Sequence, residues 1–547
     1  MENFRLIFIS ILFVNFLHGI EYSFIGGIVK SDEVISTSEI ELIENSYLEA
    51  KNIIEDLFKL KFKNEKVEIV FLSSTYEFTK NFGVDYKIGG ISTRNNVYFQ
   101  PIRVLRTKSD LRKIFLHEFL HFWIDKIGNL PDFINEGIAL YYSKLFNKNT
   151  TLIFPEGLED KEIFTEDYYF SSKEFVRYLI EKKLLHSVLS NSNYVEVYRK
   201  FYFENADKIR VLVNPRKERE LSVKLSSGYA TIFSKDGEFE VKNSQFKILM
   251  EGKRIFVLGR EVFSIHFKTD KFILNDRSYR GELLITNELA INILPVEYYV
   301  YSVVNSEIPP SELEAMKVQA VLSRTLAYYF IKSRKNEPYD VNSLTDSQSY
   351  RGMSEENEQS KRCIIDTEGE ILTFAGSIIP VYFSSTCGGK TANSEDVWND
   401  YLPFYRSKDC FYNGETNCNI SEHFKEWERF LTNDFLYSIG ITNVEFVYSG
   451  ERVKRVIVDG RIESFDVFKA RISKILGWNF LKSNFLTIEK KENGYLIKGR
   501  GLGHGVGVCQ YGAIGLAKKG KNYREILSFY LSGVEIEKFK NQNPWGF

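Results

Sequence analysis

Hydrophobic residues recur along this chain with two different periods, and the period changes near residue 207. Residues 37–61 carry Ile and Leu at helical spacing, and residues 111–127 form a second, strongly apolar helical run. From residue 208 onward, apolar and polar residues alternate in short runs such as KIRVLVN, separated by Gly, Asp and Asn, which is typical of half-buried strands. A helical pattern returns at residues 312–331. The chain is therefore predicted to be an α+β protein with several domains.

A chain of 547 residues is too long for one hydrophobic core, so the changes of pattern are taken as domain boundaries. Short strands are expected at residues 66–73 and 96–101, within an otherwise helical first domain. The expected division is a signal peptide or N-terminal anchor over residues 1–19, a mainly helical domain with a small sheet over 20–205, a β-rich segment over 206–286 and an α+β module over 287–547, of which the β-rich segment is the front part.

The N-terminus carries Arg5 and then an apolar run from Leu6 to Leu17, which has about the length of a signal-peptide core and is too short to span a bilayer. Cleavage after this run and retention as an anchor both stay open. Export to the cell envelope, in the periplasm or the cell wall, is expected in either case. The 72 basic and 73 acidic residues nearly balance, which argues against a nucleic acid partner, because phosphate binding needs a clustered surplus of Lys and Arg.

The sequence HEFLH at residues 117–121 lies inside the predicted helix 111–127. Its spacing places the imidazoles of His117 and His121 on one face, where they can bind a divalent metal. Glu118 lies beside them, where its carboxylate can take a proton from water activated by the metal. Two histidines do not complete a zinc site, so a third ligand is expected elsewhere.

A second helix is predicted to start near Asp132, and it carries the sequence NEGIALY at residues 135–141. An HExxH motif followed by EGxAxY resembles the gluzincin metallopeptidases of the peptidase MA-like group. The resemblance implies a zincin-like domain that binds Zn²⁺, with Glu136 as the third ligand and Glu118 as the general base. The alternatives are a helix with core histidines, or a decayed site that keeps the metal without activity. The donor to the transition state is left open among Tyr141, Tyr168 and Tyr169.

Five glycines fall within residues 501–512 of the segment RGLGHGVGVCQYGAIGLA. They are interleaved with apolar residues such as Leu502 and Val506, whereas flexible linkers are polar. A buried, sharply turning segment that leaves room beside His504 is therefore expected. The alternative is a glycine-rich strand with a core histidine.

Four further segments stand before and after this one: NILPVEYYVYSVVNSEIPPSELEAMKVQAVLSRTLA at 292–327, DSQSYRG at 346–352, STCGGKT at 385–391 and YREILSFYLSG at 523–533. Together, in this order over roughly half of the chain, they resemble the SpoIID/LytB family, the sporulation-protein and amidase-enhancer module that acts on peptidoglycan. The resemblance implies a lytic transglycosylase, which cleaves between N-acetylmuramic acid and N-acetylglucosamine without water and leaves a 1,6-anhydro product.

Glu307 falls on the glutamate that this family uses as catalytic acid and base. We expect it in the turn between an apolar, strand-like run and a helix from Glu312, which a capping box at residues 311–314 would start. An acid role requires a raised pKa, which burial favours and a helix N-terminus opposes. The alternative is a solvated helix cap.

The resemblance also implies substrate-binding roles for other residues of these segments. His504 and Gln510 are expected to face Glu307 across a cleft, and an internal ion pair is the alternative role for Arg324. The expected substrate-binding residues are Lys317, Gln319, Arg324, Gln348, Tyr350, His504 and Gln510.

The five cysteines all lie in the C-terminal half. Cys363 and Cys509 stand in apolar contexts and are expected to be buried. Several SpoIID proteins have a histidine where this chain has Ser384, in a region that can hold zinc. Here Cys387, Cys410 and Cys418 could form such a site, and a disulfide between Cys410 and Cys418 is the alternative in an oxidising compartment.

Three functions compete on these grounds. The favoured one is an enzyme with two sites, a glycan-cleaving module and a zinc peptidase domain, whose partners are peptidoglycan glycan strands and peptide substrates. The second is a binding protein of the amidase-enhancer kind, with a wall amidase as partner. The third is mainly a protease that the C-terminal module tethers to the wall.

Overall fold

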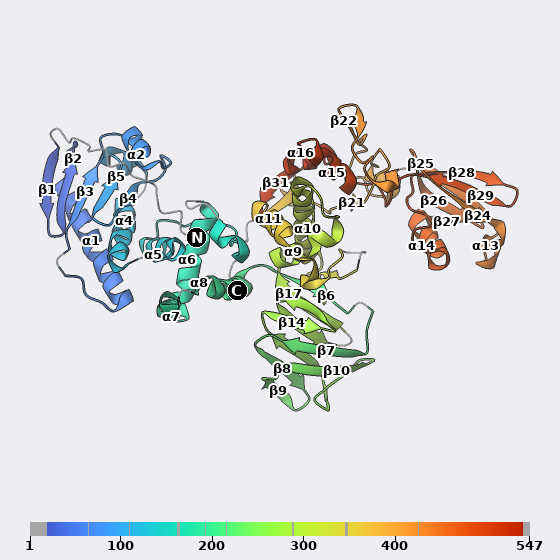
Figure 1. The fold of residues 1–547 in the computed structure, drawn as a ribbon, viewed down its shortest axis with the longest axis horizontal. Coiled ribbons are helices and arrows are strands. Elements are labelled where there is room, and N and C mark those ends of the chain that lie inside the picture. Colours follow the sequence, from blue (N-terminus) through green and yellow to red (C-terminus); the bar gives the residue numbers. More distant parts are fainter. Residues whose placement is uncertain are drawn as a thin grey trace. The chain divides into compact units, whose positions relative to one another are not determined.

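The computed structural model describes residues 19–539, except 64, 109, 129, 161–164, 192, 215, 287–288, 345–347 and 425. Residues 1–18, and with them almost all of the expected signal segment, lie outside the described residues. The chain divides into two compact units, residues 1–202 and 203–547, and each contains helices and sheets (Figure 1). The expected α+β, multidomain class is confirmed. Among the described residues, no helix is both long enough and apolar enough to cross a membrane.

The first unit contains a five-stranded sheet in the order β1-β2-β3-β5-β4. The three central strands are parallel, and the outer pairs β1/β2 and β4/β5 are antiparallel. Strand β4 therefore lies at one edge of the sheet. The strands are β1 (Ile20–Phe24), β2 (Gly27–Ser31), β3 (Val67–Phe71), β4 (Gly90–Ser92) and β5 (Asn96–Phe99).

Helix α4 is the centre of this unit. It begins after Asp110, whose side chain accepts a hydrogen bond from the N–H of Arg112, and it ends before Gly128. Its apolar residues pack between the sheet and helix α1, where the Trp123 ring contacts Tyr47. Helix α5 packs against both α4 and α6. The helices are α1 (Thr37–Phe58), α2 (Thr75–Phe82), α3 (Ile102–Lys108), α4 (Leu111–Ile127), α5 (Asp132–Ser143), α6 (Glu166–Glu181), α7 (Leu185–Asn191) and α8 (Tyr194–Asn205).

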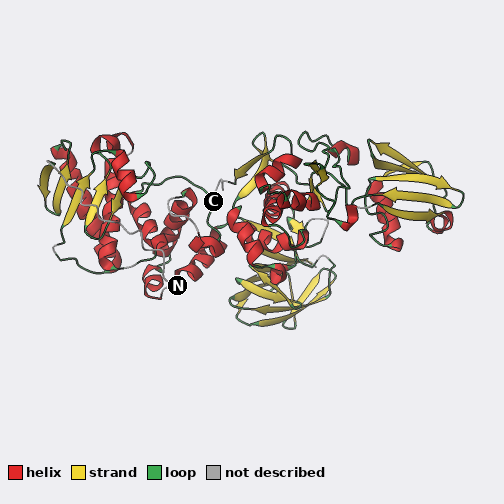
Figure 2. Cartoon of the chain, turned by 45° about the horizontal axis from the view of Figure 1, so that its top comes forward, coloured by secondary structure: helices red, strands yellow, loops and turns green. Residues whose placement is uncertain are grey.

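The second unit begins with two sheets, which Figure 2 shows as its strand-rich part. One sheet has the order β12-β11-β10-β7-β14-β15 and the other β18-β6-β17-β16-β13-β8-β9. The rings of Phe246 and Phe267, one from each sheet, meet with centroids 5.0 Å apart. The strands are β6 (Lys208–Leu212), β7 (Glu220–Leu225), β8 (Tyr229–Ser234), β9 (Gly237–Val241), β10 (Gln245–Glu251), β11 (Arg254–Val257), β12 (Arg260–Val262), β13 (Ser264–Lys268), β14 (Lys271–Leu274), β15 (Arg277–Arg280), β16 (Glu282–Thr286), β17 (Leu289–Pro295) and β18 (Val341–Asn342).

Helix α10 is the centre of the helical part that follows, and it packs against α9, α11, α15, α16 and β19. These elements come from segments far apart in the sequence. They are α9 (Val296–Glu307), α10 (Leu313–Ser333), α11 (Glu358–Asp366), β19 (Glu370–Phe374), β20 (Ser377–Ile378), β21 (Phe383–Ser384), α12 (Ser394–Val397), β22 (Phe411–Tyr412), β23 (Glu415–Thr416), β30 (Val508–Cys509), α15 (Gln510–Lys518), α16 (Tyr523–Tyr530) and β31 (Glu535–Lys538).

Residues 427–499 form a small lobe that the sequence analysis does not separate from the rest. It has its own hydrophobic core, which includes Leu431, Val456 and Phe468. Its two three-stranded sheets have the orders β24-β29-β28 and β25-β26-β27. The elements are β24 (Trp427–Thr432), α13 (Asn433–Ser438), β25 (Val444–Ser449), β26 (Arg452–Val458), β27 (Arg461–Ser464), α14 (Phe465–Leu476), β28 (Leu486–Lys491) and β29 (Gly494–Gly499).

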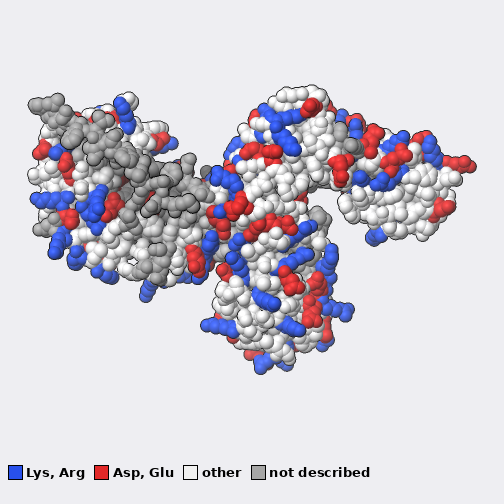
Figure 3. Space-filling view, in the orientation of Figure 1, with Lys and Arg blue, Asp and Glu red and all other residues white. Residues whose placement is uncertain are grey.

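The charged residues are spread over the surface. On the face shown in Figure 3, basic and acidic side chains are interspersed over both units. This distribution agrees with the balanced composition of the sequence, with 72 basic and 73 acidic residues.

Candidate functional sites

Two neighbouring helices of the first unit bring three donor groups together. The Nε2 atoms of His117 and His121 on α4 lie 3.2 Å apart. The carboxylate of Glu136 on α5 lies 3.5 Å from His117 Nε2 and 3.4 Å from His121 Nε2. A tetrahedral zinc site with bonds of about 2.0–2.1 Å has donor atoms about 3.4 Å apart. The three donors therefore fit a Zn²⁺ ion, and the fourth position is left for water or substrate.

A second layer of contacts orients these donors. His121 Nδ1 lies 2.9 Å from the side-chain oxygen of Asn135, which leaves Nε2 to face the metal position. Burial lowers the pKa of His117 to about 4, so its imidazole is neutral and able to bind a cation. Burial alone would lower the pKa of His121, but the hydrogen bond and charge of Glu136 raise it to about 9. The negative charge of Glu136 thus attracts a proton or a metal ion at this point.

Glu118 lies between this donor set and the edge strand β4. Its side chain is 7% exposed, and burial raises the pKa of its carboxyl to about 7. A Cβ atom added to Gly90 of β4 would lie 2.7 Å from Glu118 Cγ, so only glycine allows this approach. A carboxyl group with a pKa near neutrality can exchange a proton with bound water.

A cavity of about 750 Å³ opens beside these groups. Its lining includes Glu118, the three donor residues, the edge strand β4 and Tyr169. Among the three tyrosines left open by the sequence, Tyr169 is the one that lines the cavity, whereas the ring of Tyr168 packs against Phe133.

Glu307 is the last residue of helix α9, and five residues separate it from the start of α10. The expectation of a strand-like run before it is wrong, because residues 296–307 are helical. Residues 296–304 are all buried, so no polar face reveals the helical period in the sequence. The expected capping box is also wrong. Helix α10 begins at Leu313 without a side-chain cap, and Glu314 accepts a hydrogen bond of 2.8 Å from the N–H of Tyr523 instead.

The carboxyl group of Glu307 accepts a hydrogen bond from one neutral partner. The backbone N–H of Ser349 donates to its Oε1. Burial raises the pKa of Glu307, and the hydrogen bond from Ser349 opposes this shift without cancelling it. The end of a helix, where Glu307 lies, also disfavours a negative charge. The pKa of Glu307 is therefore raised overall, a direction that the sequence left undecided.

A chain of hydrogen bonds fixes the backbone at Glu307. The side-chain amide of Gln510 donates to the Glu307 carbonyl at 2.8 Å and to Gln319 Oε1 at 3.0 Å. The chain continues from Gln319 to Ser323 (3.2 Å), and Gln348 donates to the same hydroxyl at 2.7 Å. Gln319 and Gln348 are each 1% exposed, so they support Glu307 from inside the protein and do not line a groove. Gln510 and Glu307, 203 residues apart in sequence, are brought together.

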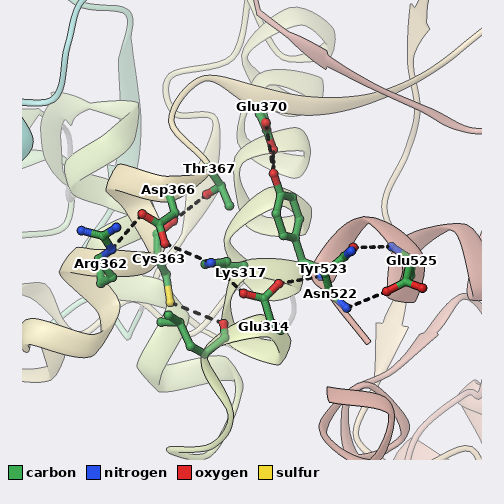
Figure 4. Close-up of polar contacts among 11 residues, drawn as sticks. Glu314, Lys317, Arg362, Cys363, Asp366, Thr367, Glu370, Asn522, Tyr523 and Glu525 are labelled. Carbon is green, nitrogen blue, oxygen red and sulfur yellow. Dashed lines mark hydrogen bonds and ion pairs between the residues drawn. The ribbon is translucent and has the colours of Figure 1, made fainter. Parts of the chain in front are cut away.

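Three other predicted substrate-binding residues are also engaged inside the fold. Arg324 is fully buried and makes two hydrogen bonds of 2.7 Å to Glu297. The structure thus shows the alternative role of Arg324, an ion pair inside the fold. The amine of Lys317 lies between the carboxylates of Glu314 and Asp366, at 2.7 and 2.9 Å (Figure 4). Tyr350 is 2% exposed, and its hydroxyl donates to Asn292.

His504 lies on the glycine-rich segment, apart from the contacts of Glu307. Its ring packs against Trp398 and Tyr382, with centroids 5.0 and 6.3 Å away, and its Nδ1 accepts a hydrogen bond from the N–H of Val506. No described contact joins His504 to Glu307, and their position on opposite sides of one cleft stays a prediction. The sharp turns expected of this segment are observed, because Gly501, Gly503, Gly505 and Gly507 all have positive φ.

All five cysteines are buried and carry free thiols, so the alternative disulfide between Cys410 and Cys418 is not formed. The Sγ atoms of four of them, Cys387, Cys410, Cys418 and Cys509, lie within 4.8 Å of one another. The sequence pointed to the first three as one group and not to Cys509. Cys509 has no other cysteine near it in the sequence, and only the fold brings it close to Cys387, Cys410 and Cys418.

The second unit is thus an α+β module in which Glu307, at a helix junction, accepts hydrogen bonds from two distant segments: its carboxyl group from the N–H of Ser349 and its backbone carbonyl from Gln510. The SpoIID family, described as stage II sporulation protein, matches residues 285–374 of this chain. An uncharacterized protein of Brachyspira hyodysenteriae is 33% identical over 306 residues, which cover 53% of this chain and 81% of that protein. The chain therefore belongs, through its C-terminal half, to the SpoIID family.

Two further relatives have descriptive names. Stage II sporulation protein D of Bacillus subtilis is 29% identical over 280 residues, covering 46% of this chain and 77% of that protein. The amidase enhancer of Bacillus subtilis is 25% identical over 288 residues, covering 43% of this chain and 40% of the enhancer.

Proposed function

We propose that the second unit acts on peptidoglycan in the cell envelope and cleaves its glycan strands by lytic transglycosylation, with Glu307 as the catalytic acid and base. The observation that carries this proposal is the setting of Glu307, a half-buried carboxyl group whose pKa is raised and whose partners are uncharged. Membership of the SpoIID family and the similarity to an amidase enhancer supply the substrate class.

The proposed reaction uses one carboxyl group twice. Protonated Glu307 donates its proton to the glycosidic oxygen as the bond to the muramic acid C1 breaks. The resulting carboxylate, to which Ser349 donates a hydrogen bond, then takes the proton from the muramic acid C6 hydroxyl. That hydroxyl oxygen attacks C1 and closes the 1,6-anhydro ring. A second carboxylate, which ordinary glycosidases need, has no part in this sequence.

Two further surfaces of the second unit suit a polymer of amino sugars with acidic peptides as the substrate. The half-buried rings of Trp398, Tyr382 and His504 provide an aromatic surface on which sugar rings can pack. A cavity of about 650 Å³ is lined by Ser349, whose N–H binds Glu307, and by three arginines, which can attract carboxylates. The arginines are Arg216, Arg277 and Arg351.

The test is the product of purified glycan strands, identified by mass spectrometry. Wild type should release 1,6-anhydro products, and Glu307→Gln should lower the rate by about 10²- to 10⁴-fold, because it removes the proton that is transferred. Glu312→Gln is a matched control at the same helix junction, since Glu312 is exposed and its side chain caps nothing. Unchanged release of anhydro products by Glu307→Gln would refute the assignment. Stimulation of a wall amidase without any product would assign the unit to a binding role.

We further propose that the first unit is a zinc-dependent peptidase domain, because the three donors at 3.2–3.5 Å border a cavity that also contains Glu118. His117, His121 and Glu136 would hold Zn²⁺, which would supply Lewis-acid activation of water and of the peptide carbonyl. Glu118 takes the proton from the attacking water and delivers it to the leaving amine.

The rest of this cavity suits an extended peptide. The free edge of β4 can pair with a peptide backbone as an added strand. Tyr169 lines the same cavity, and its hydroxyl is a candidate donor to the oxygen that becomes negative in the transition state.

The peptidase proposal is tested on casein and on wall peptides, with a chelator control. Glu118→Gln should lower hydrolysis by about 10²- to 10⁴-fold while the zinc content stays the same, because Glu118 moves a proton and binds no metal. Glu166→Gln serves as the control, since this carboxylate lies on the same cavity but is exposed and pairs with Lys148. Hydrolysis at the wild-type rate by Glu118→Gln would rule out this mechanism.

A further inference from the structure

Four thiols from three separate segments meet in the interior of the second unit. Cys387 follows β21, Cys410 and Cys418 lie on either side of the β22–β23 hairpin, and Cys509 ends β30. Each of the four is at most 1% exposed. Their Sγ atoms all lie within 4.8 Å of one another, and those of Cys387 and Cys418 are 3.7 Å apart.

These separations suit one metal ion better than a disulfide. Zinc binds thiolate sulfur at about 2.3 Å, so the sulfur atoms of a tetrahedral site are about 3.8 Å apart. A disulfide requires the two sulfur atoms to be about 2.05 Å apart. The four sulfur atoms therefore lie at the spacing of a metal-bound set.

Hydrogen-bond donors surround the sulfur atoms. The backbone N–H groups of Cys387 and Gly512 point at Cys509 Sγ, with N–S distances of 3.2 and 3.3 Å. The Tyr530 hydroxyl lies 3.2 Å from Cys410 Sγ. Such outer contacts are characteristic of metal ligands, because a thiolate needs donors that stabilise its negative charge.

A buried cation lies next to the cluster. Arg452 is 4% exposed, and its guanidinium donates to the backbone oxygens of Cys387 and Lys390 at 3.0 and 2.8 Å. Among the described residues, no carboxylate forms an ion pair with it at 4.0 Å or less. A buried cation without a carboxylate partner is costly unless other negative charge compensates it. Four thiolates around a divalent ion carry a net charge of about −2 by simple count, and this would provide that compensation.

We propose that Cys387, Cys410, Cys418 and Cys509 bind one Zn²⁺ ion in a structural site. As the metal binds, four Zn–S bonds form and each thiol gives its proton to solvent. The four ligands fill the coordination sphere, so the ion has no open position for catalysis.

The site would join the STCGG segment, the β22–β23 hairpin and the glycine-rich segment. Cys509 immediately precedes Gln510, whose amide holds the Glu307 carbonyl. The metal would therefore hold in place the segment that positions Glu307. This inference concerns metal binding and does not depend on the proposed reaction.

The test measures zinc in the purified full-length chain. The double substitution His117→Ala/His121→Ala serves as the background, because it removes two donors of the other site. We expect one zinc per chain in this background, and its loss when Cys418→Ser is added. Cys363→Ser is the matched control, since Cys363 is a buried free cysteine outside the cluster, and zinc should be retained. No bound zinc in the folded background protein would overturn the proposal.

A second measurement does not require the Cys418 variant to fold. Cobalt(II) bound to the background protein should show the intense near-ultraviolet sulfur-to-metal bands of tetrahedral thiolate coordination, and added zinc should abolish them. Alkylation in denaturant with chelator and without reductant should label all five cysteines. Fewer labelled cysteines would reveal a disulfide and contradict the metal site. A failure of the zinc peptidase proposal would change none of these results.

Discussion

Glu118 in the first unit and Glu307 in the second are both carboxyl groups whose pKa is raised by loss of contact with water, but their surroundings differ in charge. Around Glu118 lie His121 and Glu136, which act on its pKa in opposite directions. Around Glu307, the effects are burial and one backbone N–H, that of Ser349. The first setting contains three donor groups that could hold a cation, and among the described residues no such donor group includes Glu307.

This difference separates two uses of a glutamate. A general base beside a metal must be ionised when water is attacked, and the nearby cation favours that state. A carboxyl group that starts a reaction by giving away a proton must hold that proton, which burial among neutral partners favours. The charge of the neighbours thus distinguishes the two roles, although both groups are glutamates close to helices.

The largest expected effect that tests this contrast is on pH dependence. Glycan cleavage requires protonated Glu307, so its kcat/KM should fall about tenfold for each pH unit above the pKa of this group. Because that pKa is raised, the decline should begin above the ordinary carboxyl value of 4.5. Peptide hydrolysis by ionised Glu118 should rise with pH over the range in which glycan cleavage falls. Measured pH–rate profiles with the same trend for both activities would contradict the contrast.

The same group should also affect stability. A folded-state pKa above the unfolded value means that the folded protein holds the proton more tightly, so stability is lost as pH rises from the unfolded value through the folded one. Wild type should therefore lose stability relative to Glu307→Gln as pH rises, as measured by urea unfolding at several pH values. Parallel pH curves for the two proteins would indicate that the pKa is not raised.

The donor set of the first unit could be predicted because its members are close in sequence. His117, His121 and Glu136 lie on consecutive helices, and helical spacing alone puts the two histidines on one face. The surroundings of Glu307 could be predicted only in part, because they depend on contacts between distant segments. The apolar run just before Glu307 looked like a strand for a different reason: a helix that is buried on several sides has no polar stripe to reveal its period.

The next effect concerns Asn135, which contacts one of the proposed zinc ligands of the first unit. Asn135→Ala removes the oxygen that lies 2.9 Å from His121 Nδ1 and orients its ring. Loss of such a contact typically weakens metal binding by about 10- to 100-fold. Competition with a chromophoric chelator measures the change. Asp132→Asn, on the same helix and lining the same cavity, is the control and should change the affinity little. Equal affinities of Asn135→Ala and wild type would mean that the ring is held by other contacts.

The roles of the polar residues buried in this module could not be predicted from the sequence. A family pattern marks Lys317, Arg324 and Gln348 as important, but it does not say whether they touch a substrate or support the residue that does. The decisive facts are partners such as Glu297 and Asp366, which no local pattern connects to them. The same holds for Cys509, which lies 122 residues from Cys387, the residue whose N–H contacts its sulfur.

The smallest expected effect comes from Gln510, which positions Glu307 without taking part in the proton transfer. Gln510→Ala removes the donor to the Glu307 carbonyl and to Gln319, and leaving buried acceptors unpaired costs about 1–3 kcal/mol of stability. The carboxyl group itself remains, so kcat should fall only about tenfold, equivalent to about 1.4 kcal/mol in the barrier, while the pH profile keeps its shape.

Gln359→Ala is the matched control for that substitution, because its amide also bonds a carbonyl of the connection between α9 and α10, that of Ser311, but is exposed. It should leave both kcat and the melting temperature nearly unchanged. If Gln510→Ala lowered stability but not kcat, the amide would serve the fold alone. If Gln510→Ala abolished activity as completely as Glu307→Gln, Gln510 would have to contact the reacting sugar. Its assignment as a residue that only positions the proton donor Glu307 would then be wrong.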